Sequence, residues 1–203
     1  MSLEAIYTDL LLQLGFEKTN IDKHWKVLEK KYSSKNRKYH NLTHISNMVL
    51  LYETYKERLN HKNEVLYALF YHDIIYKITR KDNEIESAKF AIQLLPKITT
   101  ANRNLIYNMI CATQLHKHNI VEDINWLIDF DLHILASDWE NYQVYFQQIR
   151  KEYKIYPNLL YNPGRKKALE HFLENDFIFQ TNEFRIKYDA KARENIQKEI
   201  NQL

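Results

Sequence analysis

Four polar clusters interrupt the otherwise apolar stretches of this 203-residue chain. Each places imidazole or carboxylate groups among residues that would normally form a core, and together they cover residues 37–44, 71–73, 113–116 and 129–132. A carboxylate is expensive to bury without a partner, which a divalent cation, an arginine or a helix N-terminus can supply. The clusters are therefore candidates for a metal site, with structural pairing as the alternative.

Spacing within two of the clusters restricts what their side chains can do together. His40 and His44 are four residues apart, which at the start of a helix places them on one side. Either both bind a metal, or one binds a metal and the other faces a substrate. Asp129 and Asp131 are two residues apart and cannot share a helix face. We favour Asp131 as the inward carboxylate, because it lies one turn before Leu135.

The order of these residues resembles that in the HD superfamily of metal-dependent phosphohydrolases: His44, then His72-Asp73, then Asp131. The likeness covers residues 37–180 and is closest to a small bacterial subfamily known only as predicted HD phosphohydrolases. Its motifs read here as Arg37-x-Tyr39-His40-Asn41-x-x-His44-Ile45, Ala68-x-x-x-His72-Asp73-x-x-Tyr76, Asp82-Asn83-Glu84-x-x-Ser87-Ala88, Thr113-x-x-His116, Asp129-x-Asp131-Leu132-x-Ile134-Leu135, Arg150-x-Glu152-Tyr153 and Gly164-Arg165.

The resemblance implies a compact, all-α HD-type domain with a metal held by His44, His72, Asp73 and Asp131. This mixed nitrogen and oxygen set suits Mn²⁺, Fe²⁺, Co²⁺, Ni²⁺ or Zn²⁺, as one ion or two. Asp73 could also orient the nucleophile. The motif Tyr39-His40-Asn41-x-x-His44 also resembles the start of the cyclic-nucleotide phosphodiesterase site. This resemblance implies that His40 is the general acid. The rest of that signature is not evident, which argues against cyclic nucleotides.

Further residues are candidates for supporting roles in such a site. Arg37 is expected to hold phosphate oxygens, and Lys117 and Arg165 are further candidates for the same role. His116 could complete a second metal site, line the substrate pocket or simply pack. Glu84 could hydrogen-bond a metal ligand or serve as a helix-start carboxylate. Asp129 stays a candidate for the second metal or the substrate.

These features predict an enzyme that hydrolyses a phosphate ester or anhydride in a nucleotide-like small molecule. One alternative is an HD scaffold that binds a nucleotide or metal without turnover. Another is a helical interaction protein whose histidines and aspartates are structural.

Composition restricts the class of protein. Two glycines and three prolines are too few for many tight turns, which favours helices. A net charge of +3 is too small to indicate binding to nucleic acid or membranes. The single Cys111 excludes an intrachain disulfide. Because no signal peptide and no apolar run of roughly 20 residues is visible, we expect a cytoplasmic protein.

Apolar residues recur at helical spacing along the whole chain, which predicts one all-α domain over residues 1–203. The expected C-terminal helix at 183–200 is charged and should be peripheral and loosely packed, and Asn162-Pro163-Gly164 should form a turn. The other helices are expected at residues 3–14, 20–32, 41–60, 65–72, 85–95, 100–110, 122–136, 137–153, from 157 onward, and 166–175.

Overall fold

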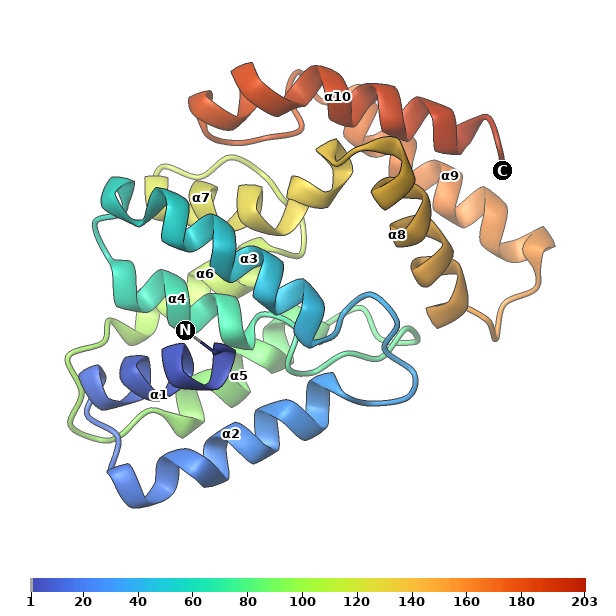
Figure 1. The fold of residues 1–203 in the computed structure, drawn as a ribbon. Coiled ribbons are helices and arrows are strands. Elements are labelled where there is room, and N and C mark those ends of the chain that lie inside the picture. Colours follow the sequence, from blue (N-terminus) through green and yellow to red (C-terminus); the bar gives the residue numbers. More distant parts are fainter. Residues whose placement is uncertain (1) are drawn as a thin grey trace.

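The most apolar stretch of the chain forms the central helix. In the computed structural model, which describes residues 2–203, α4 (Lys62–Tyr71) buries every side chain from Val65 to Tyr71. A helix that is apolar on all sides must be enclosed by others. Accordingly α1, α3, α5, α6 and α7 pack against it (Figure 1).

All regular structure in residues 2–203 is helical, so the predicted all-α single domain is confirmed. None of these helices combines the length and apolar composition needed to cross a bilayer. The elements are α1 (Leu3–Gln13), α2 (Lys18–Tyr32), α3 (Leu42–Tyr55), the 3₁₀ turn η1 (Lys56–Arg58), α4, α5 (Asn83–Leu94), α6 (Arg103–Ala112), α7 (Glu122–Leu132), the 3₁₀ turn η2 (His133–Ala136), α8 (Trp139–Glu152), α9 (Asn158–Glu174) and α10 (Asn182–Ile200).

Local signals place several helix ends where the sequence predicts them. Asn41 caps α3, because its side chain accepts hydrogen bonds from the N–H groups of Thr43 and His44. Gly15 follows α1 with a positive φ of 85°, which glycine adopts without strain. The helices expected to reach Asn60 and Ala136 end earlier, and each continues as a short 3₁₀ turn.

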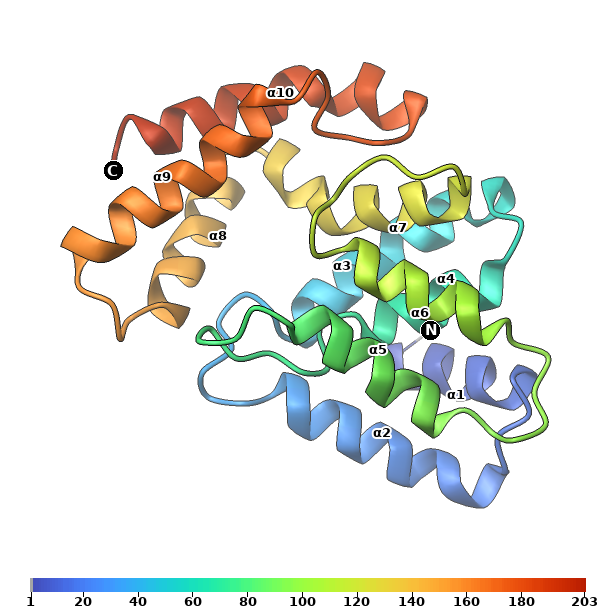
Figure 2. The same ribbon diagram turned by 180° about the vertical axis from the view of Figure 1, so that it is seen from behind.

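The C-terminal third lies beside and above the central bundle. Figures 1 and 2 show α8 and α9 on one side, with α10 running across η2, α8 and α9. The expectation that the last helix packs loosely is wrong, because α10 buries Phe184, Ala192 and Ile196. Most residues of α10 are charged or polar, so its average composition does not reveal the few apolar residues that are buried.

The predicted turn at Asn162-Pro163-Gly164 is also wrong, since α9 continues through it. Pro163 lacks an N–H and disrupts the bond to the carbonyl four residues earlier. That earlier residue is Leu159, which is 85 % exposed. The interruption therefore falls on the outer side of the helix, where water can replace the lost bond.

Candidate metal centre

Ends of three helices meet at one point inside the molecule. His44 lies in the first turn of α3, His72 directly follows α4, and Asp131 lies in the last turn of α7. His44 Nε2 lies 3.3 Å from His72 Nε2 and 3.2 Å from Asp131 Oδ1. His72 Nε2 lies 3.8 Å from the same oxygen. Residues far apart in sequence thus bring three donor atoms within 4.8 Å of one another.

These separations fit a shared metal ion. Two ligands that each lie about 2.1 Å from one ion, at angles of about 90–109°, are roughly 3.0–3.4 Å apart. Two of the three separations, at 3.3 and 3.2 Å, fall in this range, and the third, at 3.8 Å, slightly exceeds it. The donor set of two imidazoles and a carboxylate is one that transition metals accept.

A hydrogen bond to the backbone fixes the orientation of the His72 imidazole. Its Nδ1 lies 2.9 Å from the carbonyl oxygen of Leu69, which accepts a hydrogen bond and leaves Nε2 directed at the centre. Such a bond on the far ring nitrogen is the usual support of a metal-binding histidine. His72 is 1 % exposed.

Asp73, which the sequence predicts as a fourth ligand, places a second carboxylate beside the group of His44, His72 and Asp131 but is not part of it. Its Oδ2 lies 3.3 Å from His72 Nε2. Burial lowers the pKa of His72, but the carboxylates of Asp73 and Asp131 outweigh burial and raise it to about 9. Negative charge at this point thus stabilises a cation, and a divalent ion would experience the same attraction.

His40 lies beside the three ligands. Its Nε2 is 4.0 Å from Asp73 Oδ2, and its Nδ1 is 2.7 Å from Glu152 Oε2. Tyr76 stacks on the ring at 4.3 Å between centroids. Burial lowers the pKa of His40, but Asp73 and Glu152 outweigh burial and raise it. An imidazole held in this way can carry a proton to a group that lies between it and Asp73.

Glu152, the last residue of α8, organises the whole loop that carries His40. Its Oε1 accepts hydrogen bonds from the N–H groups of Lys38, Tyr39 and His40, at 2.6, 2.8 and 3.1 Å. Its Oε2 accepts another from the Tyr76 hydroxyl at 2.7 Å. Burial raises the pKa of Glu152, but these hydrogen bonds and His40 outweigh burial and lower it to about 2.

Glu152 is the functional residue that reasoning from the sequence missed. The sequence motifs contain it only within Arg150-x-Glu152-Tyr153, where it has no assigned role. The sequence gives a weak signal, because Glu152 is a carboxylate at the end of an amphipathic helix. In the structure its side chain is buried, with 4 % exposure. Nothing in the sequence connects it to a loop more than 100 residues earlier.

His116 and Glu84 lie on the far side of Asp131 from His44. His116 Nε2 lies 3.2 Å from Asp131 Oδ2, so the two oxygens of this carboxylate face different histidines. Glu84, in the first turn of α5, lines the same hollow, and burial raises its pKa. The His116 imidazole contacts Asp131 and borders a hollow, which favours a role in a second metal site or in the pocket.

Two expected phosphate-binding arginines have other partners. Arg37 is 8 % exposed and donates to the carbonyl oxygens of His40, Asp73 and Ile74, so it fixes the loops on either side of the centre. Arg165 donates to both carboxylate oxygens of Glu199 at 2.7 and 3.0 Å. Neither guanidinium is thus the free clamp that its position in the motifs predicts.

The remaining two candidates lie away from the donor atoms. Lys117 is exposed in the loop between α6 and α7. Asp129 is fully buried and accepts hydrogen bonds from the N–H groups of Gln180 and Thr181 and from the Thr181 hydroxyl. It therefore fastens the start of α10 to α7, and Asp131 is the one of the two carboxylates that faces the centre.

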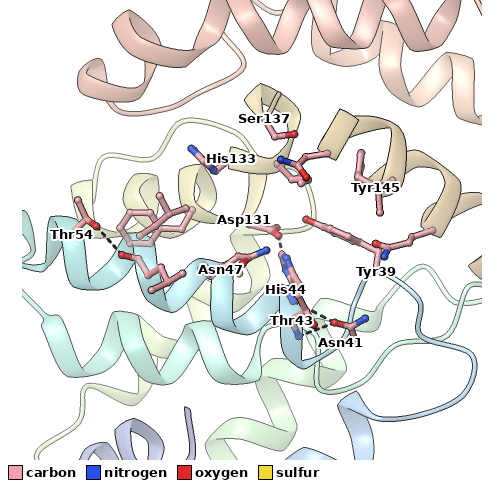
Figure 3. A pocket seen from close by; sticks show the side chains of 18 residues that line it. Tyr39, Asn41, Thr43, His44, Asn47, Thr54, Asp131, His133, Ser137 and Tyr145 are labelled. Carbon is pink, nitrogen blue, oxygen red and sulfur yellow. Dashed lines mark hydrogen bonds and ion pairs between the residues drawn. The ribbon is translucent and has the colours of Figure 1, made fainter. Parts of the chain in front are cut away.

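Two hollows border the centre, and Asp131 lines both of them. One of about 270 Å³ is bordered by Asp73, His40, His116 and Asp131, with Arg80 and Lys81 at its edge. The other, of about 580 Å³, lies between α3 and α8 and is bordered by His44 and Asp131. Figure 3 shows these two side chains facing each other at its base. Small molecules can therefore reach His44 and Asp131.

No family model, no curated protein and no solved structure matches this chain. The properties of its centre accordingly follow from its own residues.

Proposed function

We propose that this protein is a metal-dependent phosphohydrolase that acts on a phosphate ester or anhydride in a small, nucleotide-like molecule. The observation that carries the proposal is the convergence of His44, His72 and Asp131 beside a histidine, His40, that a buried glutamate holds in place. The order of these residues along the chain, which resembles that of HD phosphohydrolases, supports the phosphate as the reacting group.

The ligand set would hold one divalent transition metal, or two if His116, Glu84 and the second oxygen of Asp131 take part. Such an ion would stabilise negative charge on the phosphoryl group and increase the acidity of water. Mn²⁺, Fe²⁺, Co²⁺, Ni²⁺ and Zn²⁺ all accept imidazole and carboxylate ligands.

The chain's own residues would supply the proton transfers. A water oxygen forms a bond to phosphorus while the bond from phosphorus to the leaving oxygen breaks. His40 gives its proton to the leaving oxygen, and Asp73 takes the proton that the water loses. His40 Nε2 and Asp73 Oδ2 are 4.0 Å apart, a separation that one bridging water can span, so that proton can return to His40 through the water and restore the starting state.

The hollow of about 270 Å³ has the size for the phosphoryl group. Arg80 pairs with Asp82 through two hydrogen bonds of 2.8 Å, whereas Lys81 is exposed at its edge. With Arg37 engaged elsewhere, Lys81 and the metal would be the cations that meet the phosphate oxygens. This assigns phosphate binding to a residue outside the motifs.

Metal analysis followed by a substrate screen tests the proposal. Purified protein reconstituted with Mn²⁺, Co²⁺ or Zn²⁺ should retain one or two ions per chain after gel filtration, and His72→Ala should retain fewer. A panel of phosphate monoesters and anhydrides should then be hydrolysed by the wild type, with a loss of at least about 100-fold in His40→Ala. His171→Ala, which removes an exposed histidine, is the matched control.

Each outcome has a distinct meaning. Retained metal with no hydrolysis of any phosphate compound would favour a binding module over an enzyme. If no metal is retained under any condition, both the metal-dependent enzyme and the metal-binding module are rejected. Full activity in His40→Ala would exclude this residue as the general acid while leaving the metal centre intact.

A further inference from the structure

A third hollow, of about 470 Å³, begins at His40 and extends between α8 and α9. His40 and Tyr153 border both this hollow and the smaller one at the metal centre. The imidazole that we assign as proton donor is therefore adjacent to both spaces. A leaving group whose oxygen lies beside His40 has this hollow directly behind it.

Four tyrosines form its walls, and we name it the tyrosine cavity for these residues: Tyr145, Tyr153, Tyr156 and Tyr161. Apolar side chains, including the buried Ile149, complete the lining. Flat aromatic rings stack favourably on such surfaces, and stacking accepts many ring types because every ring has a π-face.

Apart from the imidazole of His40 at its start, the cavity offers no free charge for a second phosphate. Arg165 is the only lysine or arginine among the residues that line it. Its guanidinium donates to both oxygens of Glu199 and to the Tyr145 hydroxyl at 3.3 Å, so its charge is already neutralised. An anionic leaving group such as a diphosphate would lose its hydration here without gaining a cation.

The tyrosines are held in position before anything binds. Arg150 donates to the carbonyl oxygens of Tyr153 and Tyr156 and to the side chain of Asn158, which ties the end of α8 to the start of α9. Its guanidinium also lies 4.6 Å from the ring centre of Tyr161. A site that is ordered in advance loses less entropy when a ligand enters.

Gly164 leaves one wall of the cavity open. It lies inside α9, where glycine is less favourable than alanine, and a Cβ added there would meet no atom within 4 Å. A local choice that weakens a helix and leaves space in a cavity is typical of a functional position.

We infer that the tyrosine cavity holds a flat aromatic ring of the leaving group. The substrate would then be a phosphate monoester of an uncharged alcohol that carries such a ring, in preference to a polyphosphate. This inference rests on the proposed function, since it assigns the leaving side of the same reaction. It also assigns the larger hollow between α3 and α8 to something other than the ring.

Two phosphate esters that differ only in the ring test the inference. Adenosine 5′-monophosphate and ribose 5-phosphate present the same ester, with and without an aromatic base. With Mn²⁺ we expect kcat/KM for the first to exceed that for the second at least tenfold. Gly164→Phe fills the cavity and should reduce this ratio toward one by lowering activity on adenosine 5′-monophosphate alone. The exposed position and the open space around Gly164 should allow the variant to fold.

Val144→Phe is the control, because Val144 lies on α8 but borders the larger hollow at 51 % exposure. It should leave the ratio unchanged. An equal loss on both substrates in Gly164→Phe, or a selective loss in Val144→Phe, would overturn the inference.

Binding of adenosine by calorimetry separates failure of the inference from failure of the proposed function. If no phosphate compound is hydrolysed, adenosine should still bind the wild type and Val144→Phe, and bind Gly164→Phe at least tenfold more weakly. That result would retain the cavity as a ring site while the hydrolase is rejected. Equal binding to all three proteins, or none to any, would reject the cavity assignment.

Discussion

At the scale of single residues, the centre depends on how one carboxylate fixes one imidazole. Glu152 binds His40 Nδ1, so the other ring nitrogen, Nε2, faces Asp73 across the hollow of about 270 Å³. The same carboxylate holds the loop backbone through three N–H groups. Replacing Glu152 should therefore disturb the orientation of the His40 ring and lower the stability of the fold. The loss of stability should depend on pH.

Glu152→Gln should lower the free energy of unfolding by about 1–3 kcal/mol at pH 7, because the charged acceptor is lost. The pKa of Glu152 is about 2 in the folded protein, below the ordinary 4.5. Its contribution is thus complete above pH 4.5 and declines as pH falls toward 2. Urea unfolding should show the wild type and variant converging as the pH is lowered from about 5 to about 3. A gap that is constant with pH would contradict this account.

The control for this measurement is Glu170→Gln, which changes a half-exposed glutamate on α9. Its surface pair with Lys166, at 3.9 Å, should contribute little at any pH. The unfolding curves of this variant should follow those of the wild type throughout the same range.

Residue types and order suffice to predict part of the site. His44, His72, Asp73 and Asp131 interrupt apolar helix sequences, and the cost of burying such groups unpaired follows from their chemistry alone. The role expected for Arg37 could not be predicted in this way, because its partners are backbone carbonyl oxygens, which every residue possesses. Only the fold determines which carbonyl oxygens lie within its reach.

At the scale of elements, the turn that follows α6 leads to a strained residue, His116, whose imidazole contacts Asp131. His116 has φ of 50°, and its N–H donates to the carbonyl of Ala112, as in a left-handed helix cap. Glycine is the usual residue there, because a side chain costs about 1–2 kcal/mol in this conformation. The structure retains an imidazole at this position despite the strain.

Two substitutions separate that strain from the function of the side chain. His116→Gly and His116→Ala both remove the imidazole and should lower activity to a similar extent. His116→Gly should be about 1 kcal/mol more stable than His116→Ala, because only glycine adopts the positive φ freely. Thermal unfolding of both variants checks this, and equal melting temperatures would show that the backbone is not strained.

Helices themselves were predictable, but their ends and packing were less so. Asn41 and Gly15 signal helix boundaries through local hydrogen bonding and φ, so these predictions are confirmed. Pro163 would ordinarily end a helix, but α9 continues through it in the folded protein. The buried face of α10 depends on η2 and α8, which no local pattern in α10 contains.

At the scale of the whole molecule, Asp129 connects the central bundle to the C-terminal helix. Its carboxylate accepts three hydrogen bonds, of 2.6 to 2.7 Å, from Gln180 and Thr181. Asp129→Asn places an amide donor against these donors and should cost about 1–3 kcal/mol of stability. Metal content per folded chain should not change, because this side chain faces away from the donor atoms. A loss of metal with stability intact would reverse the roles of Asp129 and Asp131.

Metal binding should in turn stabilise the whole fold, because its ligands come from α3, the end of α4 and α7, and meet only in the native state. At about 100 times its dissociation constant, an ion that binds only folded protein adds about 2.7 kcal/mol. For a chain of this size that amounts to roughly 5–11 °C in melting temperature. Chelator should remove this increment from the wild type and from His171→Ala. Asp131→Asn should have no increment to lose, whereas Asp129→Asn should melt lower but keep the full increment. The same loss on chelation in Asp131→Asn as in the wild type would place the ion elsewhere in the molecule.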